Sequence, residues 1–144
     1  QVDIIAGVAT AGIPQGALVA EALGLPFIYI RSSAKEHGMG NQIEGVVQEG
    51  ARVVLIEDLI STGGSSLKAA QAVRDAGMQV MAIVSVFTYG FAQAAENFKQ
   101  AKVESLSLTD YATLLQVAQE NRYIAESDLQ KLNAWRETPE SWTA

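Results

Sequence analysis

The chain has 144 residues, 49% of them hydrophobic, which is enough for one globular domain with its own core. Its 10 Lys and Arg side chains against 16 Asp and Glu give a net charge of -6, which argues against a broad electrostatic surface for nucleic acid or an anionic membrane. Because cysteine is absent, disulfides, thiolate metal sites and cysteine nucleophiles are excluded. Any anion that the protein binds therefore needs a local site.

No apolar run approaches the roughly 20 residues of a membrane-spanning helix. No charged-then-apolar leader precedes the first apolar segment either, so we expect a cytoplasmic protein. That segment begins almost at Gln1, with no helix or cap before it. We therefore expect residues 1–144 to form a single domain that lacks its natural N-terminal segment.

Short apolar runs rich in β-branched residues predict buried strands, and apolar residues at helical spacing predict helices. The predicted strands are Asp3–Ala9, Pro26–Ile30, Arg52–Glu57, Gln79–Phe87 and an alternating edge strand over Lys102–Leu108. The predicted helices are Gln15–Leu23, which opens after Pro14, then Ser65–Ala76, Phe91–Gln100, Thr109–Asn121 and Ser127–Arg136. Strands that alternate with helices at this spacing predict an α/β fold, a parallel sheet flanked by helices with right-handed crossovers.

One segment has no helical periodicity. Residues 31–50 contain four glycines and predict a long mobile loop, with a short strand over Ile43–Val47. Three basic side chains, Arg31, Lys35 and His37, lie within seven residues of this otherwise acidic chain. A loop of this length inside a compact domain is usually functional or disordered, although a solvated basic loop is the simpler interpretation.

Two acids follow a buried strand directly in the stretch RVVLIEDLISTGG, which runs from Arg52 to Gly64. A buried strand gains nothing from unpaired carboxylates, because their desolvation is costly. In an open parallel sheet, ligands bind beyond the carboxyl ends of the strands, where loops enter helices. Glu57 and Asp58 lie at such an end and are therefore candidate ligand contacts.

The next residues, Ser61 to Ser65 (STGGS), supply hydroxyls, two glycines and backbone N–H groups at a helix N-terminus. Such a bend can hold a phosphate, because unpaired amides and the helix dipole both favour an anion. It can also be no more than a helix N-cap and a tight turn. The two neighbouring acids would repel a phosphate unless they contact another part of the same ligand, such as vicinal sugar hydroxyls. A sugar phosphate satisfies both halves of the site.

These residues resemble a known family. VVLIEDLISTGGS is similar to the phosphoribosyl-pyrophosphate signature of the type I phosphoribosyltransferases, and EDLISTGGS is most similar to the orotate phosphoribosyltransferases. GVATAGIP (Gly7 to Pro14) resembles the pyrophosphate-side loop of the family, and RSSAKEHGMGNQIEG (Arg31 to Gly45) resembles its flexible catalytic loop. The C-terminal SLTDYATLL is also similar, so the resemblance spans nearly the whole chain.

The resemblance implies a Rossmann-like parallel sheet flanked by helices, with a long flexible loop. It implies transfer of the phosphoribosyl group from phosphoribosyl pyrophosphate (PRPP) to orotate, giving orotidine 5-phosphate and pyrophosphate in pyrimidine (UMP) biosynthesis. Mg²⁺ would arrive as the magnesium complex of PRPP, without a dedicated metal site on the protein. A homodimer with shared active sites is implied as well. A purine phosphoribosyltransferase and a non-catalytic PRPP-sensing regulator are the alternatives.

The resemblance also assigns roles to individual residues. Asp58, Lys35 and His37 would be catalytic, with Asp58 the more important acid of the pair, and its charge would favour an oxocarbenium-like ribose. Arg31, Lys35 and His37 would close over the pyrophosphate and exclude water. Ser61 would also reach the orotate ring. The implied substrate contacts are Arg31, Lys35, His37, Glu57, Asp58, Leu59, Ile60, Ser61, Thr62, Gly63, Gly64 and Ser65.

Two further sets of residues allow either a functional or a structural interpretation. In the first loop, Thr10 and Gly12 can present a hydroxyl and amides to pyrophosphate or form an ordinary strand-to-helix turn. Aromatic rings after the fourth predicted strand can approach a base, pack in the core or contact a second subunit. These rings are Phe87, Tyr89 and Phe91. Trp135 and Trp142 are interpreted as structural.

The chain departs from the family pattern at several positions. Some orotate enzymes have a lysine after the loop arginine, where this chain has Ser32, and a lysine in the first loop, where it has Ala11. Others have an arginine after the fourth strand, which FTYGF does not offer. In the family, a section before the first strand helps to bind orotate. A protein limited to these residues would thus bind PRPP but turn over slowly or not at all.

Overall fold

The computed structural model describes residues 1–33 and 42–139, and its centre is a six-stranded sheet in the order β3-β2-β1-β4-β5-β6. The strands are β1 (Ile4–Val8), β2 (Phe27–Ile30), β3 (Ile43–Glu44), β4 (Arg52–Ile60), β5 (Gln79–Thr88) and β6 (Ser105–Asp110). All neighbouring strands are parallel except β3, which is antiparallel to β2. In that pair Ile43 lies opposite Ile30 and Glu44 lies opposite Tyr29, so β3 runs against the direction of the other strands.

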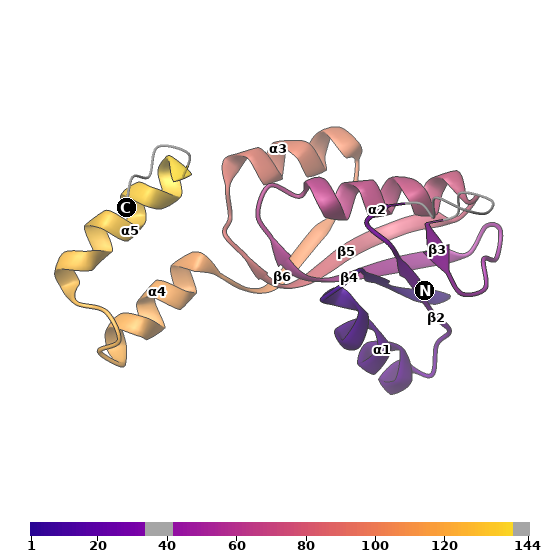
Figure 1. The fold of residues 1–144 in the computed structure, drawn as a ribbon, viewed down its shortest axis with the longest axis horizontal. Coiled ribbons are helices and arrows are strands. Elements are labelled where there is room, and N and C mark those ends of the chain that lie inside the picture. The colour runs from indigo at the N-terminus through magenta and orange to yellow at the C-terminus, as the bar shows by residue number, and fades with distance from the viewer. Residues whose placement is uncertain (34–41, 140–144) are drawn as a thin grey trace.

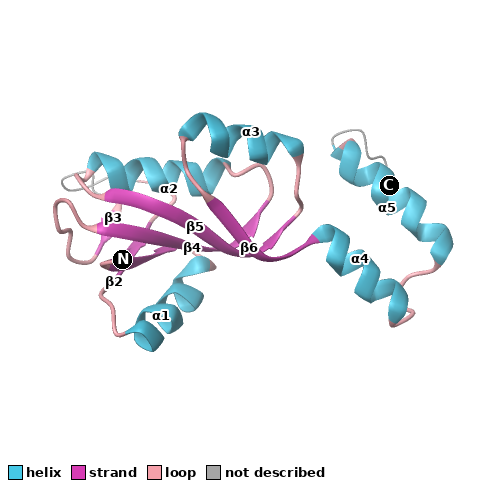
Figure 2. Cartoon of the chain, turned by 180° about the vertical axis from the view of Figure 1, so that it is seen from behind, coloured by secondary structure: helices cyan, strands magenta, loops and turns pink. Residues whose placement is uncertain are grey.

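Helices cover both faces of the sheet, which confirms the predicted α/β layers (Figure 1). They are α1 (Gly12–Leu23), α2 (Gly64–Asp75), α3 (Ala92–Ala101), α4 (Tyr111–Glu120) and α5 (Glu126–Glu137). Helices α2 and α3 lie on one face and α1 lies on the other, while α4 and α5 extend beyond the β6 edge (Figures 1 and 2). Among the residues described, no helix is both long and apolar enough to cross a membrane.

The core divides between these two faces. The larger cluster joins strand residues such as Val53 and Ile83 to Val73 of α2 and Phe98 of α3. The smaller cluster packs α1 against Ile5 and Ile56, among others. Strand β1 is buried along its whole length, as its unbroken apolar sequence predicts.

The predicted helices are confirmed, and their first residues agree to within one residue except in α1 and α4. Helix α1 starts at Gly12 instead of Gln15. Pro14 fits in its first turn, because the N–H that proline lacks would have no partner within the helix at that position. Helix α4 starts at Tyr111 instead of Thr109, since the Thr113 amide donates to Oδ1 of Asp110 at 2.8 Å and so makes Asp110 the N-cap. The residues before Tyr111 continue β6 alongside β5.

The predicted end of the strand that begins at Arg52 is wrong by three residues. Strand β4 continues from Glu57 to Ile60, so the acid pair lies within the strand and not after it. The extension exists because β5 pairs with β4 as far as Ile60, whereas β1 pairs with β4 only as far as Ile56. From Glu57 onward β4 therefore has a strand neighbour on one side only.

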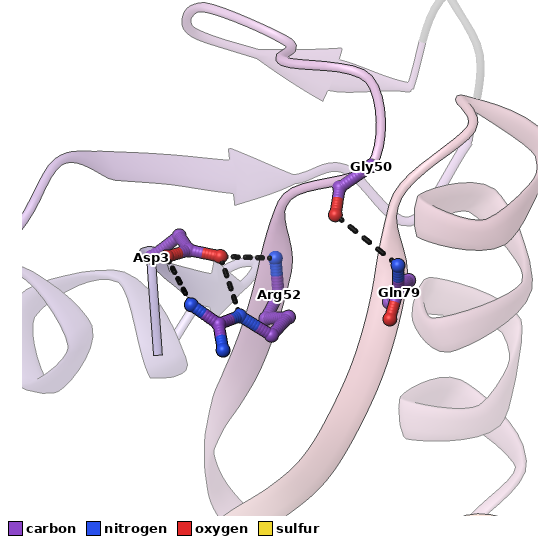
Figure 3. A network of polar contacts seen from close by, with 4 residues as sticks. All are labelled: Asp3, Gly50, Arg52 and Gln79. Carbon is purple, nitrogen blue, oxygen red and sulfur yellow. Dashed lines mark hydrogen bonds and ion pairs between the residues drawn. The ribbon is translucent and has the colours of Figure 1, made fainter. Parts of the chain in front are cut away.

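The opposite end of the sheet is held by a polar network (Figure 3). Arg52 donates from its backbone N–H and from Nε to Oδ2 of Asp3, at 2.9 and 2.8 Å, and from Nη2 to Oδ1 at 2.9 Å. Its guanidinium holds the pKa of the Asp3 carboxyl well below the usual range. On the other side, Gln79 Nε2 donates to the Gly50 carbonyl at 3.3 Å. The starts of β1, β4 and β5 are thus tied together far from the acid pair.

Candidate active site

The acid pair lies in the part of β4 that extends beyond the end of β1. The two acidic side chains differ in their exposure to solvent. Glu57 is 5% exposed and lies under α2. Asp58 is half-buried, and Leu59 beside it is exposed. The Ile60 side chain packs in the core, so a ligand could contact only the backbone of that residue. Of the two acids, Asp58 is therefore the more accessible to a ligand.

Glu57 is held by two hydrogen bonds from different elements. Ser66 Oγ of α2 donates to Oε2 at 2.9 Å, and the Asp58 N–H donates to Oε1 at 3.1 Å. Burial and the adjacent Asp58 carboxyl raise the pKa of Glu57 to about 7, although both hydrogen bonds act in the opposite direction. An acid poised near neutrality beside an accessible carboxylate is typical of a functional site.

The bend after β4 leads into α2 without a side-chain cap. The N-cap residue is Gly63, with φ of 81°, and it has no side chain that could accept a hydrogen bond from the first turn. Ser61, Thr62, Gly64 and Ser65 are exposed. The alternative in which a hydroxyl of this segment caps the helix is therefore wrong, and the amides of the first turn are available to an anion.

Helix α3 supports this bend from behind. A Cβ added to Gly63 would lie 2.7 Å from Cε2 of Phe98, so the Phe98 ring fills the space behind that glycine. Asn97 Nδ2 donates to the Thr62 carbonyl at 2.9 Å. The shape of the bend thus depends on two consecutive residues of α3.

A cavity of about 260 Å³ brings three of the sequence motifs together. It lies between the ends of β1 and β2 and the first turns of α2, and its lining residues are Val8, Ala9, Ile30, Arg31, Ser32, Gly64, Ser65, Lys68 and Ala69. Two cations, Arg31 and Lys68, line it together with the start of a helix, which favours an anionic ligand. Sequence reasoning missed Lys68, although its position three residues after Ser65 places both on one face of α2.

The predicted basic loop is described only at its ends. Arg31 is half-buried and its Nη1 lies 3.4 Å from Oε1 of Glu44, an ion pair that holds the guanidinium beside the cavity. Ser32 lines the same cavity. Lys35 and His37 lie outside the described residues.

The two candidate residues of the first loop, Thr10 and Gly12, differ in their surroundings. Gly12 is buried, and a Cβ on it would overlap the carbonyl oxygen of Ile56, so its role is close packing of α1 on β4. Thr10 is exposed and follows a cis peptide bond from Ala9. Of the two candidates in this loop, only Thr10 has an exposed side chain that a ligand could contact.

The aromatic residues after β5 pack with the C-terminal helices. The Tyr89 ring stacks on Phe91 at 5.3 Å between centroids and meets the edges of Phe87 and Trp135 at 5.3 and 5.4 Å. Arg136 of α5 donates from Nε to the Tyr89 carbonyl at 3.0 Å. These rings therefore pack against one another and against Trp135, but they are half-buried, and Phe87 and Tyr89 also line a cavity of about 530 Å³ with Trp135. Contact with a base or with a second subunit stays a prediction, and Trp142 lies outside the described residues.

Within residues 1–33 and 42–139, no group of three or more His, Cys, Asp or Glu side chains could hold a metal ion. The family model for the phosphoribosyl transferase domain matches residues 1–117, which include the whole sheet, the acid pair and the start of α2.

The chain belongs to the phosphoribosyl transferase family.

Among curated phosphoribosyl transferases, the orotate phosphoribosyltransferase of Bacteroides thetaiotaomicron is 56% identical over 144 residues, which is 100% of this chain and 68% of that protein. A solved structure of Leishmania donovani UMP synthase matches with a TM-score of 0.79 and 25% identity, over 94% of this chain and 29% of that one. The orotate phosphoribosyltransferase of Aeropyrum pernix matches with a TM-score of 0.74 and 29% identity, over 87% of this chain and 68% of that one.

The fold is shared with enzymes that act on a different base. The adenine phosphoribosyltransferase of Leishmania tarentolae matches with a TM-score of 0.63 and 26% identity, over 77% of this chain and 62% of that one. The expected type I phosphoribosyltransferase fold is thus confirmed, but the fold by itself does not discriminate orotate from a purine.

Proposed function

We propose that this protein transfers the phosphoribosyl group of PRPP to orotate, giving orotidine 5-phosphate and pyrophosphate in pyrimidine biosynthesis. The observation that carries the proposal is the acid pair beside an uncapped helix start, in a chain 56% identical to an orotate phosphoribosyltransferase. The acids suit ribose hydroxyls, and the amides suit a phosphate ester.

In this proposal the bend holds the 5-phosphate through the N–H groups and hydroxyls of Ser61 to Ser65. Asp58, the accessible acid, accepts hydrogen bonds from the ribose hydroxyls, and its charge stabilises positive charge that develops on the ribose as pyrophosphate leaves. Ser61, where the bend begins, contacts the orotate ring. Glu57 takes part in binding the ribose from its buried position under α2.

The cavity beside the bend is the proposed place for the pyrophosphate. Arg31 and Lys68 would neutralise part of its charge, and Thr10 would donate from its hydroxyl. Lys68 would thereby supply a cation that Ser32 cannot, although it comes from a different element. Lys35 and His37 are proposed to close over the leaving group, by resemblance alone.

Three further features belong to the proposal. Mg²⁺ enters as part of the substrate, as the magnesium complex of PRPP, because oxygen-rich pyrophosphate supplies the ligands that this ion prefers. The enzyme is a homodimer with shared active sites, and it works in the cytoplasm. Resemblance to the family supports both of these last two.

A base-selection assay tests the proposal. The full-length protein receives magnesium PRPP with orotate, hypoxanthine, xanthine or adenine in turn, and release of pyrophosphate is followed. We expect turnover with orotate only. Turnover confined to a purine would establish the purine phosphoribosyltransferase alternative and reject ours.

The non-catalytic alternative, a PRPP sensor, is separated by Lys35→Ala. An enzyme that uses this side chain against the leaving group should lose most of its turnover and keep most of its affinity for magnesium PRPP. A sensor that binds PRPP without turnover would be unaffected by the change. Calorimetric binding and pyrophosphate release, measured on the same preparation, distinguish these results.

A further inference from the structure

Ser66 lies inside the contact between α2 and β4, one position beyond the proposed phosphate-binding bend. Its side chain is 1% exposed, so its hydroxyl and the contact with Glu57 are shielded from solvent. From the geometry we infer that Ser66 is a positioning residue, whose hydroxyl fixes the orientation of the Glu57 carboxylate for its part in binding the ribose. This inference rests on the proposed function.

The two donors to Glu57 fix its carboxylate as a pair. Ser66 Oγ holds Oε2 at 2.9 Å and the Asp58 N–H holds Oε1 at 3.1 Å. Because one donor comes from a helix and the other from the strand, rotation of the carboxylate would break both bonds. The remaining lone pairs therefore point in directions set by the packing of α2 on β4. Loss of the Ser66 hydroxyl would leave Oε2 buried without this donor.

The same hydroxyl also stabilises the charge on Glu57. Burial and the Asp58 carboxyl disfavour the ionised form, and the hydrogen bond from Ser66 partly offsets them. Strands β1 and β5 carry no charged residue, and α1 carries only Glu21, in its last turn. The charged residues of α2 are Lys68, Arg74 and Asp75. Within the described residues, none of these forms a hydrogen bond or ion pair with Glu57, so Ser66 is the side-chain donor that favours its charge.

A second buried serine provides a matched control. Ser85 on β5 is also 1% exposed and lies opposite Glu57 in the strand register. Its hydroxyl donates to the Phe87 carbonyl at 3.2 Å and is 2.6 Å from Ser107 Oγ, so its bonds are within and beside β5. Removing either hydroxyl should lower stability similarly, but only Ser66 should affect Glu57.

The kinetic experiment uses the full-length protein and the variants Ser66→Ala, Ser66→Thr, Ser66→Cys and Ser85→Ala. Ser66→Ala should lower kcat/KM for PRPP about tenfold and move the acidic limb of its pH profile upward by about one pH unit. Ser66→Thr keeps the hydroxyl and should restore both. Ser66→Cys keeps the side-chain size with a weak donor, and so replaces the alanine variant if that does not fold. Ser85→Ala should reduce Tm without moving the pH profile.

A measurement independent of turnover completes the test. Carbon-13 NMR of labelled glutamate carboxyls follows the titration of Glu57, with Glu57→Gln to assign its signal. The midpoint should rise in Ser66→Ala and return in Ser66→Thr. An unchanged midpoint, or a pH profile that shifts equally in Ser85→Ala, would overturn the role of Ser66. Absence of turnover in the unmodified protein would instead contradict the proposed function, and the NMR titration would still decide about Ser66.

Discussion

The ring of Phe98 occupies the space behind Gly63, so that a Cβ at position 63 would lie 2.7 Å from Cε2 of that ring. Gly63 also has φ of 81°, a conformation that residues with a Cβ rarely adopt. The N-cap residue of α2 is therefore constrained both by its own backbone and by a neighbouring helix.

Gly63→Ala should consequently damage the proposed phosphate-binding bend. We expect the free energy of unfolding to fall by about 2 kcal/mol or more, because backbone strain and the clash with Phe98 add. Calorimetry should show no binding of magnesium PRPP. Gly24→Ala is the control, because Gly24 has φ of 62° with nothing within 4 Å of its Cβ position. It should cost about 1 kcal/mol and leave binding unchanged. Normal affinity in Gly63→Ala would refute the role of the bend.

The raised pKa of Glu57 predicts a pH dependence of stability. Below pH 4.5 the Glu57 carboxyl is protonated in both the folded and the unfolded protein, and the stabilisation that arises from its raised pKa is complete. Between pH 4.5 and about 7 only the unfolded state loses this proton, so stability falls as the pH rises through this window, by about 1 to 3 kcal/mol.

Glu57→Gln should remove this dependence, because the amide resembles the protonated acid. The lowered pKa of Asp3 has the opposite effect on stability, and it acts at lower pH. The free energies of unfolding of Glu57→Gln and of the unmodified protein are therefore measured in urea, and their difference at pH 5.5 is compared with their difference at pH 8. The variant should gain stability relative to the unmodified protein on going to pH 8. A constant difference between the two pH values would contradict the raised pKa.

Asp58→Asn tests the accessible acid. The amide keeps the size of the side chain but loses its charge and one acceptor, so hydrogen bonds from ribose hydroxyls weaken. We expect affinity for magnesium PRPP to fall about tenfold, which corresponds to about 1.4 kcal/mol. Asp75→Asn, in which the altered acid is on the last turn of α2 and accepts from Gln71 at 2.7 Å, should bind normally. Equal affinities in the two variants would count against the ribose contact.

Lys68→Ala tests the cavity proposed for pyrophosphate. Removal of one of the two cations that line it among the described residues should raise the KM for PRPP about fivefold, equivalent to about 1 kcal/mol. Lys68→Arg should keep most of the affinity, because it retains the charge. Lys99→Ala in the last turn of α3 removes a lysine away from that cavity and should leave the KM as it was. The effect of Lys68→Ala should also shrink at high salt.

The sequence predicts the layers of the fold, and it identifies those candidate site residues that are consecutive along the chain. Glu57, Asp58 and the glycine-rich bend are such residues, and the structure places them at one end of β4 and the start of α2. The length of β4 was not predicted, since it depends on how far β5 remains paired after β1 has ended. Ser66 and Lys68 were missed because their contacts with the site depend on the position of α2 relative to β4 and β2.

The aromatic residues illustrate the same limit over a longer distance. Tyr89 and Trp135 are 46 residues apart in the sequence, yet their ring centroids are 5.4 Å apart. Nothing near Tyr89 in the sequence indicates that α5 will cover it. Whether such a ring faces a ligand or the interior could be decided only from the packed structure.

The position of Glu57 under α2 also couples ligand binding to the exchange of protons with the solvent. A carboxyl whose pKa is about 7 is partly protonated at neutral pH, so a ligand that favours either form must change the number of protons on the protein. The heat of binding would then include the ionisation heat of whatever buffer supplies or absorbs them. Substrate affinity would likewise follow small changes in the acidity of the surrounding medium.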